Sequence, residues 1–208
     1  QNIGGIGNVS VAGQGRVWTA FDTGPGNGLM DQAVRLATGG RRHMDEDGRL
    51  AARGRADETK VSALLQDRFF RRPPPKSIDR QAFGEAYLRR HFGPVTQKRL
   101  PGTLASLALL TARSIEYSYR RFVFPRYKIR EMVLSGGGAL NPTLLLLLHR
   151  VFKPLPVLLS DEFGVPIMAK EAACFAWLAA RALEGRTNHC PRATGAKGPR
   201  ILGKIIPA

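Results

Sequence analysis

The chain has 208 residues, 43% of them hydrophobic and 23% charged, and its 32 Lys and Arg against 16 Asp and Glu give a formal net charge of +16. This length and composition describe one large globular domain or two small ones, and they exclude a disordered chain. No apolar run approaches the ~18 residues of a membrane-spanning helix, so such a helix is excluded as well. The positive charge would attract nucleic acid or an anionic nucleotide, but no zinc or helix-turn-helix spacing is present, so an arginine-rich enzyme surface is favoured.

The first residues predict a β-hairpin, with strands over 2–12 and 16–21 joined by a turn around Gly15. Glycines and amides normally weaken a strand, so something is expected to approach the backbone closely here. The chain lacks an initiator Met and a visible secretory signal, and a strand begins at once, as in an excised or truncated piece.

The run FDTGPGN at 21–27 is the most informative in the chain. Asp22 ends an apolar strand, and the turn at Gly24 to Gly26 is expected to expose backbone N–H groups before a helix over 27–38. Such a turn and helix N-terminus favour a phosphate, while the acid can accept a proton from a substrate. The run alone equally allows a tight turn with Asp22 as a capping residue.

The middle of the chain predicts a helical layer. A charged loop over 41–56 comes first, and its Asp45 and Asp47 fail the EF-hand calcium pattern. Three prolines at 73–75 interrupt the helical pattern, and Ser77 is expected to cap the helix that follows. The three helices expected here cover residues 58–69, 79–92 and 103–121.

The last third predicts alternating strands and helices, which cover residues 132–134, 142–152, 156–159 and 168–184. Ser135 precedes three glycines that would let the backbone press against a flat ring or a phosphate. The run is neither GxGxxG nor a P-loop, so a tight structural connection is the alternative. The order predicts a mixed sheet flanked by helices, in the α/β or α+β class, with an irregular tail over 186–208. The two cysteines form no CxxC pair, which fits a reducing cytoplasm.

Seven motifs in one order carry a family resemblance: NIGGIGN (2–8), FDTGPGNGLMD (21–31), PPPKS (73–77), LTARSI (110–115), SGGGALNP (135–142), EAACFAWLA (171–179) and TGAKGPRILG (194–203). Together they resemble the C-terminal portion of anhydro-N-acetylmuramic acid kinase. The resemblance implies the ribonuclease-H-like fold of actin/hexokinase-type ATPases, here without the N-terminal domain. It also implies that ATP and water convert 1,6-anhydro-N-acetylmuramic acid to N-acetylmuramic acid 6-phosphate in peptidoglycan recycling.

The resemblance also implies roles for particular residues. Asp22 would be the base that activates water at the anomeric carbon, while the γ-phosphate captures O6. Asn27 and Glu171 would contact the sugar, although a Glu in the first turn of a helix is also a favourable dipole partner. Mg²⁺ would accompany ATP without a dedicated set of protein ligands, and a cytoplasmic homodimer is suggested. The expected ATP and phosphate contacts are Gly4, Gly5, Asn8, Gly24, Gly26, Gly136, Gly137, Gly138 and Asn141.

The family's first phosphate-binding segment has no counterpart in this chain. After PPPKS, residues 78–81 also differ from the family's usual Thr-Gly-Arg-Glu. Three hypotheses therefore stand. The chain is part of the anhydrosugar kinase, or a non-catalytic remnant that binds nucleotide weakly or pairs with another chain, or a basic nucleic-acid-binding protein.

Overall fold

The computed structural model describes residues 1–206. Its first sheet is antiparallel and holds β1 (Asn2–Ile3), β2 (Ile6–Gly13) and β3 (Arg16–Pro25) in that order. Gln14 and Gly15 join β2 to β3 with φ of 54° and 71°, the left-handed pair that a tight hairpin turn requires. The expected hairpin is therefore confirmed, and its register pairs Asn8 with Asp22.

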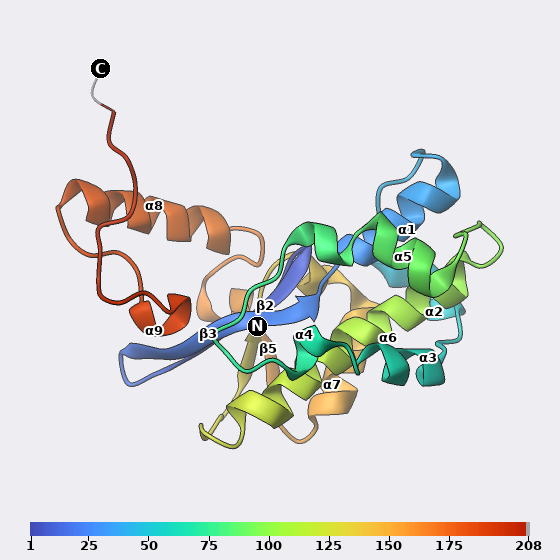
Figure 1. Ribbon diagram of the computed structural model, residues 1–208, viewed down its shortest axis with the longest axis horizontal. Helices are drawn as coiled ribbons and strands as arrows, with labels where there is room; N and C mark the ends of the chain where they lie inside the picture. Colours follow the sequence, from blue (N-terminus) through green and yellow to red (C-terminus); the bar gives the residue numbers. More distant parts are fainter. Residues whose placement is uncertain (207–208) are drawn as a thin grey trace.

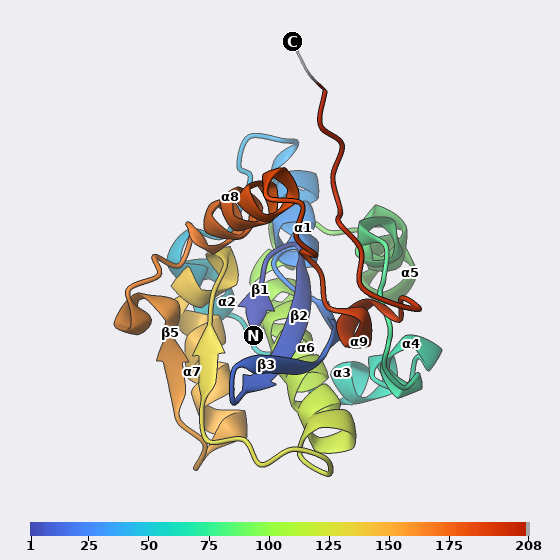
Figure 2. The same cartoon turned by 90° about the vertical axis from the view of Figure 1, so that its left-hand side faces the viewer.

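The second sheet is parallel and holds β4 (Met132–Leu134) and β5 (Val157–Leu159). A parallel bridge between Asn2 and Ser135 joins it to the first sheet, and the Ile3 N–H donates to the Ser135 carbonyl at 2.8 Å. The strands therefore run in the order β3-β2-β1-β4-β5, with an antiparallel hairpin beside a parallel set (Figure 2). The expected mixed α/β class is confirmed.

The long helix α6 (Leu100–Ser118) lies at the centre of the core and packs against β3, α1 (Gly28–Thr38) and α7 (Pro142–Phe152). Figure 1 shows this helix crossing the molecule between the strands and the smaller helices. Its apolar residues recur on most sides, and 13 of its 19 residues are buried. An apolar helix of this kind is stable only when other elements surround it.

Three short helices surround α6: α2 (Arg49–Arg53), α3 (Glu58–Leu64) and α4 (Arg68–Arg71). The loop expected over 41–56 is wrong in part, because the buried Asp45 carboxylate accepts hydrogen bonds from the N–H groups of Leu50 and Ala51 and starts α2. The helix expected over 58–69 is divided, since Asp67 accepts from the Phe69 N–H and caps a new turn.

The helix expected over 79–92 also has two parts, a 3₁₀ turn at Arg80–Phe83 and α5 (Glu85–Phe92). The prediction that Ser77 caps it is wrong. Asp79 takes that place by accepting from the Gln81 N–H at 2.9 Å. Asp79 caps the turn because its side chain reaches the N–H two residues on, as N-cap residues do.

The C-terminal part contains α8 (Lys170–Leu183) and α9 (Pro191–Thr194). The segment after residue 186, expected to be irregular, thus contains one short helix, and α9 packs against β3. In both views α8 lies apart from α3 and α6 (Figures 1 and 2). None of the helices described within residues 1–206 combines the length and apolar character needed to cross a membrane.

Candidate active site

Asp22 lies near the end of β3 and is held by the segment that follows the three prolines. Its N–H donates to the Lys76 carbonyl at 3.1 Å. Its Oδ2 accepts a hydrogen bond from the Ile78 N–H at 2.8 Å. The alternative that Asp22 caps the following helix is wrong, since Asn27 occupies the N-cap position of α1.

The surroundings of Asp22 suit a proton acceptor. Burial raises the pKa of the carboxyl group, and the Ile78 N–H and the Lys76 charge lower it part of the way. A raised pKa makes a carboxylate a stronger base, which is what proton transfer from water requires. The role of Asp22 as a base stays a prediction, with geometry and electrostatics in its favour.

A cavity of about 740 Å³ opens beside Asp22, and this volume lies within the range of small-molecule sites. Its lining comes from three separate parts of the chain, the hairpin, the segment after α4, and α9. The polar and charged residues that line it are Asn8, Asp22, Arg72, Lys76, Ser77 and Thr194. Strand pairing and the packing of α9 on β3 therefore assemble a cavity from residues up to 186 positions apart in sequence, from Asn8 to Thr194.

Lys76 is a buried cation at the wall of this cavity, with 5% of its surface exposed. Its Nζ donates to the carbonyls of Phe69 and Phe70, each at 3.2 Å. The same Nζ lies 4.6 Å from the ring centroid of Phe69 and 4.9 Å from that of Phe122. Burial, with help from the charge of Arg72, lowers the pKa of Lys76 to about 8. Lys76 thus anchors the backbone that holds Asp22.

Two glycine-rich segments distant in sequence meet at the start of α1. The N–H groups of Gly26 and Gly28 donate to the Gly5 carbonyl at 3.1 and 3.2 Å, and the Asn27 N–H donates to the Gly4 carbonyl at 2.7 Å. A Cβ on Gly26 would collide with the Gly4 carbonyl, which explains why only glycine fits there. The expectation that the turn at Gly24 to Gly26 exposes its N–H groups is therefore wrong for Gly26. Phosphate contacts of Gly24 and Gly26 stay a prediction.

The second glycine-rich turn joins the same cluster. Gly136 has a φ of 83°, and its N–H donates to the Ile167 carbonyl at 3.2 Å. A Cβ on Gly138 would meet the side chains of Ile3 and Asn27. The turn thus packs tightly against β1 and the start of α1, as the structural alternative expected. Contact with a nucleotide stays a prediction.

Two side-chain oxygens and three backbone N–H groups at these turns bear on ligand binding. The Asn27 Oδ1 is buried and has no hydrogen-bond partner among the described residues. The Asn141 Oδ1 instead accepts from the Leu144 N–H at 3.1 Å and caps α7. Among the backbone hydrogen bonds that the described residues form outside helices and strands, none is donated by the N–H groups of Gly5, Gly137 or Gly138. The cluster therefore keeps unused donors and one unused acceptor.

A second cavity, of about 370 Å³, adjoins the first, and Asn8 lines both. Its polar lining includes Ser135, Lys170 and Ser160, whose buried Oγ lacks a partner within the described residues. An ammonium group beside hydroxyls and amides suits a polar, anionic ligand.

The structure does not bring Glu171 to either cavity. Its side chain is exposed on the first turn of α8, while its neighbour Lys170 lines the second cavity. Contact of Glu171 with a sugar stays a prediction that this arrangement leaves without support.

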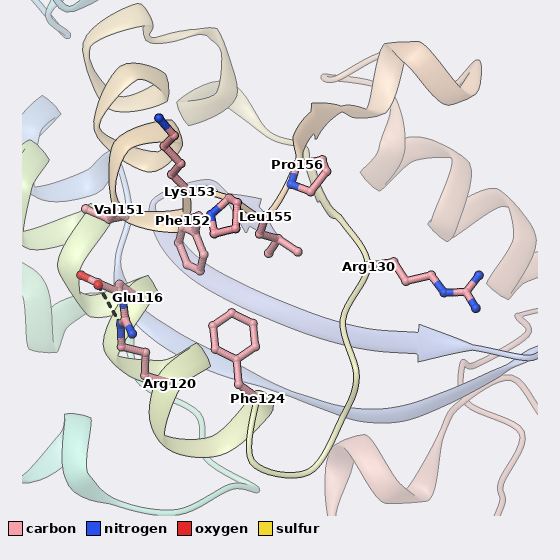
Figure 3. Close-up of a pocket in the computed structure, with 10 residues that line it drawn as sticks. Glu116, Arg120, Phe124, Arg130, Val151, Phe152, Lys153, Leu155 and Pro156 are labelled. Carbon is pink, nitrogen blue, oxygen red and sulfur yellow. Dashed lines mark hydrogen bonds and ion pairs between the residues drawn. The ribbon is translucent and has the colours of Figure 1, made fainter.

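A further cavity, of about 420 Å³, lies at the opposite ends of β4 and β5, where Arg130 and Pro156 precede the strands. Figure 3 shows the rings of Phe124 and Phe152 near one another there, in an edge-to-face arrangement, with the ion pair of Arg120 and Glu116 on one wall. None of the predicted site residues lines this cavity, so it is not part of the candidate site.

Sequence reasoning missed Lys76, Arg72, Thr194 and Lys170 as lining residues. The only sequence signal for Lys76 was its place in the PPPKS motif, and nothing local marked it as buried. No group of three or more His, Cys, Asp or Glu that could hold a metal ion is found in the described part of the chain.

A partly buried carboxylate beside glycine-rich strand-to-helix turns on a mixed sheet defines an α/β protein with the features of a phosphate- or sugar-binding site. The family model for anhydro-N-acetylmuramic acid kinase matches residues 1–208, and the chain belongs to this family. Three proteins of that name are similar to it. The one from Caldanaerobacter subterraneus is 40% identical over 99% of this chain and 53% of its own length. The protein from Streptomyces coelicolor is 39% identical over 99% of this chain and 51% of its own length. The protein from Pseudomonas paraeruginosa is 38% identical over 100% of this chain and 55% of its own length. The chain spans about half the length of the curated relatives it matches.

Proposed function

We propose that this chain forms about half of an ATP-dependent kinase that converts 1,6-anhydro-N-acetylmuramic acid and water to N-acetylmuramic acid 6-phosphate, in the cytoplasmic recycling of peptidoglycan. Its relatives carry the name of this kinase. The observation that carries the proposal is the Asp22 carboxylate, anchored through one oxygen with a raised pKa at the wall of a 740 Å³ cavity.

In this reaction Asp22 takes a proton from water as the water oxygen bonds to the anomeric carbon. The bond between that carbon and O6 breaks, and O6 bonds to the γ-phosphorus as ADP leaves. Asp22 then releases its proton to solvent. The Ile78 N–H keeps the carboxylate oriented, and the other oxygen is left for water.

The nucleotide would lie beside the glycine cluster. The unused N–H groups of Gly5, Gly137 and Gly138, together with Lys170 and Asn8, offer donors to phosphate oxygens. The tight packing of Gly136 against β1 would keep this surface flat enough for a close approach.

Mg²⁺ belongs to the proposal as the companion of ATP, whose developing phosphate charge it neutralises. Phosphate oxygens and water would supply most of its ligands, since no three acidic, His or Cys side chains converge within residues 1–206.

The strand order β3-β2-β1-β4-β5, with a hairpin beside parallel strands, supports the ribonuclease-H-like assignment. In this assignment the chain is one of the two domains between which actin/hexokinase-type ATPases bind ATP. Coverage of only 51–55% of the relatives supports the second candidate function, a chain that binds nucleotide but does not turn over alone.

A coupled ADP-release assay with MgATP and 1,6-anhydro-N-acetylmuramic acid tests the proposal, with the 6-phosphate identified by mass. Asp22→Asn should abolish turnover, whereas Asp47→Asn, a change at an exposed carboxylate paired with Arg49, should not. Full activity in Asp22→Asn would refute the assignment of the base. ATP binding without turnover in the wild-type chain would favour the second candidate.

A further inference from the structure

A separate cavity, of about 300 Å³, lies where three segments of the chain meet near the start of α6. The segments are the loop and first turn of α3, the end of α5, and the residues that lead into α6. The volume is at the lower limit of small-molecule sites. The charged residues that line the cavity are Arg55, Asp57, Lys60, Lys98 and Arg99. Four cations and a single carboxylate therefore line one cavity.

Backbone contacts hold two of these segments together. Gly54 lies so close to α6 that a Cβ on it would collide with the Pro101 carbonyl. The Asp57 N–H donates to the Ser106 Oγ at 2.9 Å, and the same hydroxyl donates to the Gly102 carbonyl at 2.8 Å. The loop before α3 is thus fixed against the first turns of α6, and the fold itself brings the cations together.

The ammonium group of Lys60 is the cation whose position is best defined. Lys60 is half-buried, and its Nζ donates to the His91 carbonyl at 3.0 Å. The same Nζ lies 5.2 Å from the ring centroid of Phe92. An ammonium group has three N–H donors, and this carbonyl uses one of them. Lys60 therefore offers a ligand in the cavity a charge that is already held in place.

The positive charge of the cavity is not neutralised by the protein. None of the ion pairs formed within residues 1–206 includes any of the four cations. Asp57 uses its Oδ1 to accept from the Lys60 N–H at 2.9 Å and so caps α3. The first turn of α6 has no acidic residue, so its helix dipole adds to the positive potential that the side chains create. These like charges repel one another, and a bound anion would remove that repulsion.

We propose that this cavity binds a small oxyanion with two or more negative charges, of the phosphate or pyrophosphate type. One negative charge would leave most of the four cations uncompensated, whereas a multivalent anion can accept charge-assisted hydrogen bonds from several of them. Thr103 lines the same cavity and adds a hydroxyl donor.

The cavity is separate from the candidate active site. The turn that follows Asp22 contacts α6 at Thr111, whose Oγ1 donates to the Gly26 carbonyl at 3.3 Å. Thr111 lies about 12 Å along the helix from Thr103. Figure 1 shows α3 and α5 at one side of the molecule and the turn between β2 and β3 at the other. The proposal therefore does not rest on the proposed kinase reaction.

Titration with sodium pyrophosphate at constant ionic strength tests this site. Pyrophosphate at ~100 times its Kd should raise the melting temperature of the wild-type chain by about 5 °C, and sodium chloride of equal ionic strength should not. The double change Lys98→Gln and Arg99→Gln should weaken pyrophosphate binding at least ~10-fold in titration calorimetry. The matched control, Arg41→Gln and Arg42→Gln, removes two exposed adjacent cations elsewhere and should bind as wild type does.

Two further measurements separate this site from the candidate active site and from general attraction by the net charge. Pyrophosphate should shift the NMR signals of amides in residues 54–60 and 98–106. Without pyrophosphate and at low ionic strength, the double variant at residues 98 and 99 should melt above the control variant, because it relieves the repulsion.

Three results would overturn the inference. The first is equal affinity for pyrophosphate in wild type and both variants, which would show only attraction by the net charge. The second is a set of NMR shifts confined to the glycine-rich turns, which would place the anion at the candidate active site. The third is an oligothymidylate that binds more tightly than pyrophosphate and loses affinity in the double variant at residues 98 and 99, which would assign the surface to nucleic acid.

Discussion

Replacement of Lys76 by Met should remove a pH dependence of stability that the buried ammonium group creates. The pKa of Lys76 is lowered by burial to about 8 in the fold, from its ordinary value of 10.5. Between these values the unfolded chain binds the proton that the folded chain has lost, so the free energy of unfolding rises with pH. At 1.36 kcal/mol per pKa unit, this gain is on the order of 3 kcal/mol, and below pH ~8 none of it is present.

The absolute stability near pH 7 is a poorer test, because two effects oppose each other there. Lys76→Met leaves the Phe69 and Phe70 carbonyls without their donor, at a cost of about 1–3 kcal/mol each. It also removes a buried charge whose burial costs about 3 kcal/mol at that pH. The slope with pH isolates the charge alone.

The measurement is urea unfolding of wild type and Lys76→Met at pH values from about 7 to about 10.5, followed by tryptophan fluorescence. The difference between the two free energies should increase in favour of wild type across this window. Lys128→Met, at an exposed lysine, is the control and should follow wild type. Parallel curves for wild type and Lys76→Met would show that Lys76 does not titrate from the buried position described. The variant should also raise the pKa of Asp22, because the Lys76 charge lowers it.

Three other expectations follow from single contacts. Gly26→Ala should lower the free energy of unfolding by ~2 kcal/mol or more, because the new Cβ meets the Gly4 carbonyl, while the control Gly102→Ala in α6 should be neutral or stabilising. Urea midpoints with equal m-values would check both variants, and equal losses of stability in the two would refute the close approach at Gly26. Asn188→Ala should detach the tail from α8, so that trypsin cleaves after Arg200 or Lys204 faster than in the control Thr187→Ala. The control should keep its contact, because Arg181 donates to the backbone carbonyl of residue 187 and not to its side chain; equal cleavage rates would count against the role of Asn188. Duplex DNA retained at low salt should be released near 0.15 M salt, as for non-specific attraction by a net charge of +16, and retention that persists there would support the nucleic-acid hypothesis.

Local signals predicted several elements to within a few residues. The helix over 142–152 was expected with the same limits as α7, because a proline suits the first position of a helix; the structure adds Asn141 as its cap. Gly39 ends α1 in the left-handed conformation, as the double glycine indicated. Predictions were wrong where one acidic side chain decided the boundary, at Asp45, Asp67 and Asp79.

The candidate site was only half predictable. Its glycine-rich turns and Asp22 are adjacent in sequence to the strands that position them, so the chemistry of each segment could be proposed from its own residues. The loss of the N–H groups of residues 26–28 to Gly4 and Gly5 could not be foreseen, because a backbone carries no signal for its distant partner.

The sequence by itself determined the mixed α/β class and the strand-to-helix turns, and it singled out Asp22 as the candidate acid, because these depend on periodicity, on glycine and proline, and on a motif of seven adjacent residues. Only the tertiary structure decided that Lys76 lies buried beneath Asp22, that α9 lines the same cavity and that α8 is left exposed. Burial and cavity lining depend on segments that meet across 50 to 190 positions, and the sequence of one segment alone does not determine the free energy of such contacts.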